Sequence, residues 1–248
     1  MYHAALWLQG AIASRQHVKA AFRQRKRTRG VALAPWRDAR HASMAKLAYY
    51  AFMTDVDVNE PHQIVERLLR YAHTDIRLVV GSPLDHLSEA LYVAVNARAV
   101  LASGLAGSIR LLGGAEIERE LRLHGQLLVG GAYRTSGGRL ASRGLKHVIH
   151  GVTVSEPGAS PRRVSVEDAF GAALLLLSDL RARTATFPEI GTRVPGLTLV
   201  QSAGLLASIL AGALRRQSPL EHITIAGLHL EYLRAVRDGL IQEGATLA

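Results

Sequence analysis

Apolar and polar residues follow two different periods along this chain, and these periods predict strands that alternate with helices. Short apolar runs bounded by glycine or polar residues are typical of buried strands, whereas apolar residues at i, i+3 and i+4 are typical of amphipathic helices. By these rules we expect strands over residues 75–80, 90–95, 128–135, 146–153, 184–187 and 223–226. We expect helices over residues 61–73, 105–123, 166–182, 197–216 and 230–241, with Pro61 in the first turn of the first helix.

Alternating strands and helices predict an α/β fold whose central sheet is covered on both faces, with ligands at the carboxyl ends of the strands. The 248 residues, of which 48% are hydrophobic, suffice for one such domain with an appendage. No apolar run is long enough to cross a bilayer, so we expect no membrane partner. The chain has no cysteine, which excludes disulfides and favours the cytoplasm, and no spacing of His, Asp and Glu indicates a metal site or a bound cofactor.

The formal charge of +10 is concentrated at the N-terminus. Residues 1–46 hold ten Lys or Arg and a single acid, Asp38. Within them lies a basic run that is able to contact nucleic-acid phosphates: Arg23, Arg25, Lys26, Arg27 and Arg29. Three interpretations of residues 1–43 remain open: a disordered or helical basic arm, a start codon set too early relative to Met44, and an Arg-rich targeting peptide. We divide the chain into this basic extension (1–43), a helical lead-in (44–74) and an α/β domain (75–248).

Two glycine-bearing segments each follow a predicted strand and open a predicted helix. The first runs from Asn96 to Gly107 and includes Gly104, and the second spans residues 187–196 and includes Gly191. Such loops present backbone N–H groups to phosphate, and an asparagine is able to bond a sugar hydroxyl. Together the two segments predict a nucleotide-like ligand. Structural interpretations remain open beside this one, because Asn96 is also suited to cap a turn and the glycines are suited to helix packing.

From Gly81 onward, the order of the motifs resembles the macro domain, the ADP-ribose-binding (Appr-1''-p processing) family. That family has Gly-Asp-Ile-Thr, then Asn-Ala-Ala-Asn at the end of a strand, a glycine-rich loop, a Val-Ile-His strand and Phe-Pro-Ala-Ile-Gly-Thr-Gly-Val-Tyr-Gly. The corresponding segments here are Gly81-Ser82-Pro83-Leu84, Val93-Ala94-Val95-Asn96, residues 104–109, Val148-Ile149-His150 and residues 187–196. The resemblance implies a three-layer α/β/α fold with a mixed central sheet, to which the basic or helical N-terminal extension is added.

The resemblance also implies which residues bind the ligand, and Asn96 is the only catalytic candidate among them. The implied set is Asn96, Gly104, Leu105, Ala106, Gly107, Ile190, Gly191, Thr192, Arg193, Val194 and Gly196, with Ser82 and Tyr232 on the adenine side.

Several positions depart from the family pattern. Ser82 replaces an aspartate that accepts from the adenine amino group, and Leu230 falls where an aromatic residue stacks on adenine. Ala106 stands where hydrolytic relatives carry an aspartate, and Pro195 lacks an N–H donor. Arg193 replaces a loop glycine, so that it either pairs with a phosphate or fills the groove.

Three functions follow as expectations. The first is a module that binds ADP-ribose, free or on a modified protein, with weak or moderate affinity. The second is a hydrolase that removes ADP-ribose from proteins or deacetylates O-acetyl-ADP-ribose. The third is a nucleic-acid-associated protein that acts through the basic run near its N-terminus.

Overall fold

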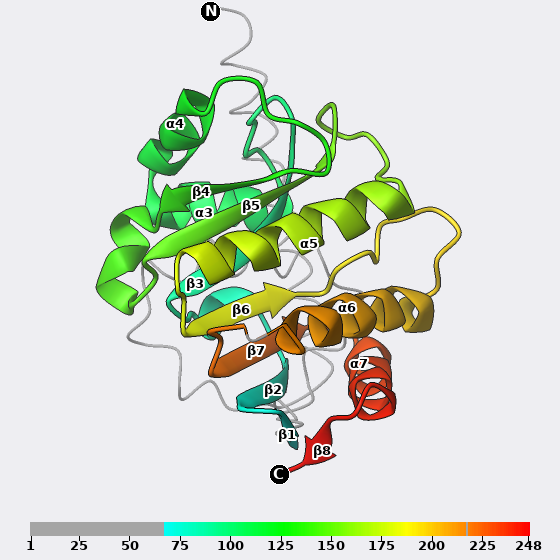
Figure 1. Ribbon diagram of the computed structural model, residues 1–248. Helices are drawn as coiled ribbons and strands as arrows, with labels where there is room; N and C mark the ends of the chain where they lie inside the picture. The colour runs from blue at the N-terminus through cyan, green and yellow to red at the C-terminus, as the bar shows by residue number, and fades with distance from the viewer. Residues whose placement is uncertain (1–66, 217) are drawn as a thin grey trace, which may run out of the picture. The chain divides into compact units, whose positions relative to one another are not determined.

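A computed structural model describes residues 67–216 and 218–248. Its centre is an eight-stranded mixed sheet in the order β4-β5-β3-β6-β7-β2-β1-β8 (Figure 1). The strands are β1 (Arg67–Tyr71), β2 (Thr74–Val80), β3 (Ala90–Asn96), β4 (Ala132–Ser136), β5 (His147–Val154), β6 (Thr184–Pro188), β7 (His222–Gly227) and β8 (Thr246–Leu247).

The five inner strands β5, β3, β6, β7 and β2 pair in parallel, whereas β4 at one edge and β1 and β8 at the other pair antiparallel. The carboxyl ends of all five parallel strands therefore meet at one edge of the sheet. This is the edge at which α/β folds bind their ligands.

Helices cover both faces of the sheet, which confirms the three-layer prediction (Figure 1). The α-helices are α3 (Gly104–Gly113), α4 (Ala115–Leu123), α5 (Arg163–Asp179), α6 (Leu199–Leu214) and α7 (Leu230–Gln242), with short 3-10 helices η1 (Pro83–Asp85) and η2 (Gly138–Arg143). One core joins α5, α6 and α7 to the sheet, and the other joins α3 and α4 to its opposite face.

The helix expected over residues 61–73 is wrong where the structure describes it, because Arg67–Tyr71 is strand β1. Leu69 is fully buried, while Leu68 next to it is 43% exposed, which is the period of a strand. Leu69 pairs with Ile76 of β2 across a tight turn in which Ala72 adopts a φ of 52°. Residues 61–66 and the rest of the expected lead-in and basic extension lie outside the described residues, so the division of the chain there stays a prediction.

Glycines determine the bounds of two further elements. The helix expected over residues 105–123 divides at Gly113-Gly114 into α3 and α4, and Gly114 takes a φ of 111° there. The strand expected from residue 128 begins only at Ala132, because Gly130 adopts a φ of 91° in the turn before it. No helix in the described part of the chain combines the length and apolarity needed to cross a membrane.

Candidate functional site

A cleft of about 330 Å³ opens at the carboxyl edge of the parallel strands. Three segments line it: the end of β3 with the loop into α3, the end of β5 with residues 157–161, and residues 188–193 after β6. The two segments that the sequence predicted to converge therefore do so, with Asn96 on one side and Gly191 on the other. The volume lies at the lower end of the range for small-molecule sites, roughly 300–1,000 Å³.

Asn96 ends β3 and lies at the cleft, with 9% of its surface exposed. The β3–β5 pairing shifts register beside Asn96: Val95 pairs with Val152 and Asn96 with Val154, so that Thr153 of β5 is left as an extra residue at the cleft. Its Oδ1 accepts from the N–H groups of Arg98 (3.1 Å) and Val100 (3.2 Å), and its Nδ2 donates to the Val100 carbonyl (2.8 Å). The turn-capping interpretation is therefore correct, and the side chain keeps one N–H for a ligand.

Of the four residues expected from the start of α3, only Ala106 lines the cleft. Ser103 and Ala106 line it, whereas Gly104, Leu105 and Gly107 do not. A Cβ at Gly107 would lie 2.9 Å from the Ala102 carbonyl carbon, so this glycine serves close packing. No side chain caps the N-terminus of α3, which leaves its first N–H groups available beside the cleft.

The second loop lines the cleft with Ile190, Gly191, Thr192 and Arg193. The backbone of this loop is held by α6, because Ser202 of that helix donates from Oγ to the Gly191 carbonyl at 3.0 Å. Gly191 itself has a φ of 82°, a conformation that favours glycine.

Tyr232, expected on the adenine side, does not line the cleft. Its ring is fully buried, and its hydroxyl accepts from the Ile190 N–H (2.8 Å) and donates to the Ile190 carbonyl (3.1 Å). Burial raises the pKa of the Tyr232 phenol, which therefore remains a neutral donor. Through these two hydrogen bonds Tyr232 holds the second loop at Ile190.

Three other expected contacts also lie away from the cleft lining. Ser82 is 3% exposed and caps η1, its Oγ accepting from the Leu84 N–H at 3.2 Å. Val194 is 7% exposed and belongs to the core, and Gly196 lies beyond the lining residues.

Sequence reasoning missed Glu189, which lines the cleft directly after β6. Its carboxylate accepts from the His229 backbone N–H at 2.7 Å and contacts the His229 ring at Nδ1, also at 2.7 Å. The Glu189 side chain crosses Gly227, where any Cβ would collide with it. The signal was available, because an acid stands here where the family motif has alanine.

Two arginines in the loops that line the cleft differ in their ion pairing. Arg98 and Glu156 form a bidentate pair, with Nε to Oε1 at 2.8 Å, and this pair lowers the pKa of Glu156 and raises that of Arg98. Arg193 is exposed at the cleft and makes no ion pair with the described residues. An exposed guanidinium without an acidic partner is suited to binding an anionic group. Within the described residues no group of three His, Asp or Glu could hold a metal ion.

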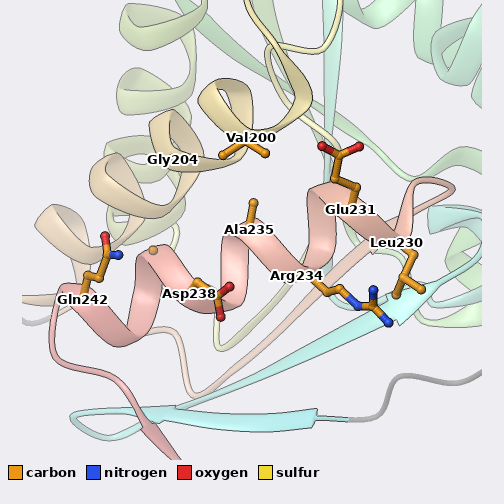
Figure 2. A pocket seen from close by; sticks show the side chains of 9 residues that line it. Val200, Gly204, Leu230, Glu231, Arg234, Ala235, Asp238 and Gln242 are labelled. Carbon is orange, nitrogen blue, oxygen red and sulfur yellow. The ribbon is translucent and has the colours of Figure 1, made fainter.

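A larger groove of about 450 Å³ lies between α6 and α7 (Figure 2). It is lined by Val200 and Gly204 of α6 and by residues along α7, among them Ala235 and Asp238. None of the predicted binding residues lies there, and no strand end or glycine loop opens into it. We therefore assign the site to the smaller cleft, where Asn96 and both loops meet.

Comparison with known proteins identifies the family to which this chain belongs. The family model described as "Macro domain" matches residues 93–206. A macro domain-containing protein of Streptomyces griseus is 32% identical over 127 residues, covering 49% of this chain and 70% of the relative. The chain belongs to the macro domain family.

Other relatives are uncharacterized proteins. One from Aeropyrum pernix is 35% identical over 128 residues, which are 50% of this chain and 66% of the relative. One from Mycobacterium tuberculosis is 29% identical over 162 residues, 64% of this chain and 43% of the relative. The chain thus spans about two thirds of the archaeal relative and under half of the mycobacterial one.

Solved structures share the fold. A mutant of the Oceanobacillus iheyensis macrodomain with ADPR has a TM-score of 0.58 at 19% identity, covering 70% of this chain and 95% of that one. The Trypanosoma brucei macrodomain in complex with ADP has a TM-score of 0.57 at 21% identity, covering 68% and 69%.

Proposed function

We propose that this macro domain binds ADP-ribose, or a closely related nucleoside diphosphate, in the cleft at the end of β3 and β6. The observation that carries the proposal is the convergence of Asn96, the uncapped start of α3 and residues 190–193 on one cavity. Macrodomains of the same fold have been solved with ADPR and with ADP, which supports this ligand class.

Each part of the ligand has a partner in the proposed complex. The N–H groups at the start of α3 and in residues 190–193, together with Arg193, bind the diphosphate. The remaining N–H of Asn96 donates to a ribose hydroxyl.

Glu189 takes over the role of the aspartate that Ser82 replaces. Its side chain crosses Gly227, whose carbonyl accepts from the Gly81 N–H at 2.8 Å, so the carboxylate lies next to the strand end that carries Ser82. Each carboxylate oxygen has a second lone pair beyond its bond to His229, and a charged acceptor binds an adenine amino group more strongly than a hydroxyl does.

Hydrolysis by this domain is expected to be slow or absent. Ala106 supplies no carboxylate to the cleft, and the carboxylate of Glu189 is engaged by His229. Proton transfer to or from a reacting water needs a positioned acid or base, which is not provided by the other residues that line the cleft. Recognition of ADP-ribose, free or attached to a protein, is therefore the proposed activity.

Isothermal titration calorimetry of the full chain with ADP-ribose tests the proposal. We expect a dissociation constant of about 10 μM to 1 mM, because Leu230 stands where the family has an aromatic ring that stacks on adenine. Asn96→Ala should abolish measurable binding. A wild-type protein that gives no heat with millimolar ADP-ribose would exclude the proposal. Efficient release of ADP-ribose from a modified protein, lost in Asn96→Ala, would instead establish the hydrolase.

The nucleic-acid alternative depends on Arg23, Arg25, Lys26, Arg27 and Arg29, which lie outside the described residues. It stays a separate prediction. A salt-dependent affinity for RNA or DNA that the full chain has and a chain starting at Met44 lacks would support it.

A further inference from the structure

A tyrosine at the floor of the cleft has a ring that belongs to the core and a hydroxyl that makes no hydrogen bond within the described residues. Tyr92 of β3 is 1% exposed and lines the cavity from below. Its ring packs edge-on against Phe170 of α5, with ring centroids 5.5 Å apart and planes at 74°. Phe170 in turn packs edge-on against Phe187. The ring is thus held firmly between α5 and the sheet, where Figure 1 shows α5 running alongside β5.

The direction of the Tyr92 ring follows from its neighbour on β5. A Cβ at Gly151 would collide with the Tyr92 hydroxyl, so this oxygen lies directly over Gly151. Gly151 pairs with Ala94, two residues nearer the carboxyl end of β3 than Tyr92. The ring therefore leans along the strand toward the cleft. Its hydroxyl lies about level with Ala94. Ala94 precedes Asn96 by two residues, which is about 7 Å along the strand.

The Tyr92 hydroxyl is a buried donor that lacks a hydrogen-bond partner among the described residues. Buried polar groups are nearly always paired, because a buried donor without an acceptor has lost its hydrogen bonds to water and gained none in return. Burial raises the pKa of Tyr92, so the group is a neutral phenol at neutral pH and has a proton to donate. Tyr232 makes the contrast clear, since its equally buried hydroxyl makes two bonds to Ile190.

We propose that the cleft has an inner subsite, bounded by Tyr92, Ala94, Thr153 and Val166, in which the Tyr92 hydroxyl donates to an oxygen of the bound nucleoside diphosphate sugar. The acceptor is an oxygen of the terminal ribose or of the diphosphate. Either group comes within reach of the Tyr92 hydroxyl when the ligand is held at Asn96. Gly151 belongs to this subsite, because a side chain at that position would displace the hydroxyl. The assignment rests on the proposed binding of ADP-ribose.

The substitution Tyr92→Phe tests the subsite, because it keeps the ring contact with Phe170 and removes only the oxygen. We expect the affinity for ADP-ribose to fall about three- to tenfold, which corresponds to one neutral hydrogen bond. We also expect the thermal midpoint of the ligand-free protein to stay or rise, because no bond within the fold is lost. Comparison with ADP locates the acceptor: loss of affinity for both ligands indicates the diphosphate, and loss for ADP-ribose alone indicates the terminal ribose.

Tyr133→Phe is the matched control. The Tyr133 hydroxyl accepts from the Leu128 N–H at 2.9 Å and does not line the cleft, so this variant should lower the thermal midpoint and leave the affinity unchanged. Equal affinity of the wild type and Tyr92→Phe for ADP-ribose would overturn the subsite alone, as would a lower midpoint of ligand-free Tyr92→Phe. A wild type that binds neither ligand would overturn the proposed function itself, and the subsite with it.

Discussion

Asn96 shows how one side chain serves both the fold and the cleft. A primary amide offers two N–H donors and two acceptor lone pairs, and three of these four are used within the turn to Val100. The remaining N–H is the group that a ribose hydroxyl would meet. The structural and functional interpretations of this residue are therefore compatible, and the structural bonds fix the orientation that binding requires.

Arg193 is predicted to bind the ligand, because its side chain is exposed at the cleft and lacks an acidic partner among the described residues. Arg193→Gln should weaken ADP-ribose binding roughly five- to twentyfold at low salt, with a smaller difference at high salt, because an exposed ion pair with a phosphate is screened. Calorimetry at two salt concentrations measures both effects. Arg216→Gln is the control, since Arg216 is exposed after α6 and lines neither cavity. Tighter binding by Arg193→Gln would mean that the side chain obstructs the cleft.

Tyr232→Phe should be destabilising, in contrast to Tyr92→Phe. It removes both bonds to Ile190 and leaves the buried Ile190 N–H unpaired, at a cost of about 1–3 kcal/mol. Affinity for ADP-ribose should also fall, because the second loop loses its support. Denaturant unfolding and calorimetry measure the two effects. Unchanged stability would show that Tyr232 does not hold the loop.

The sequence predicted which loops line the cleft, and it predicted only some of the residues that do so. Asn96 and Arg193 line the cleft as expected because each lies directly in a segment that the strand ends position. Tyr232 and Ser82 could not be judged from spacing, because their burial depends on how α7 and η1 pack. Glu189 was overlooked because its importance depends on Gly227, which is 38 residues away and adjoins it only in the folded sheet.

At the scale of elements, the ends of β6 and β7 are coupled through Glu189 and Gly227. Gly227→Ala should destabilise the protein by about 1–3 kcal/mol, because the new Cβ collides with the Glu189 side chain and displaces it from His229. In a Glu189→Ala background the same substitution should cost far less. Denaturant unfolding of the four proteins gives the coupling free energy. Equal costs in both backgrounds would show that the two positions are independent.

Periodicity predicted the inner strands and α5 to α7 well, because their apolar residues bury on a continuous core. It failed at β1, because the i, i+3/i+4 pattern that predicted a helix over residues 61–73 includes Leu68 and Leu69, which lie in a strand paired with β2. The two-residue β8 carries no period at all, and only its pairing with β1 defines it. The break between α3 and α4 needed the conformation of Gly114, although the adjacent glycines marked its place.

At the scale of the whole molecule, strand order is a property that no local pattern contains. Neighbouring strands in the sheet are mostly distant in sequence: β2 pairs with β7, and β3 lies between β5 and β6. The resemblance to the macro domain predicted a mixed sheet between two layers of helices but not the order of its strands, and apolar periodicity indicated only that strands and helices alternate. The strand order also determines where the cleft forms, because this order brings the end of β3 beside the ends of β5 and β6.

The buried core also predicts how the whole fold responds to acid. His150 of β5 is fully buried and hydrogen-bonds through Nε2 to Thr135 Oγ1 at 2.9 Å. Burial, and to a lesser extent the charge of His124, lowers the pKa of His150 from 6.5 to about 3. Between these two values the unfolded chain binds a proton that the native protein does not, so stability falls as pH drops below 6.5. From pH 7 to pH 5 this one group should cost about 2 kcal/mol.

Denaturant unfolding of the wild type and of His150→Gln at pH 7 and pH 5 measures this contribution. The glutamine amide is still able to bond Thr135 but does not titrate, so the variant should lose about 2 kcal/mol less than the wild type over the same interval. His124→Gln serves as the control, because His124 is exposed and its replacement should leave most of the acid sensitivity in place. Identical losses in the wild type and His150→Gln would show that His150 takes up a proton as readily in the folded protein as in the unfolded chain.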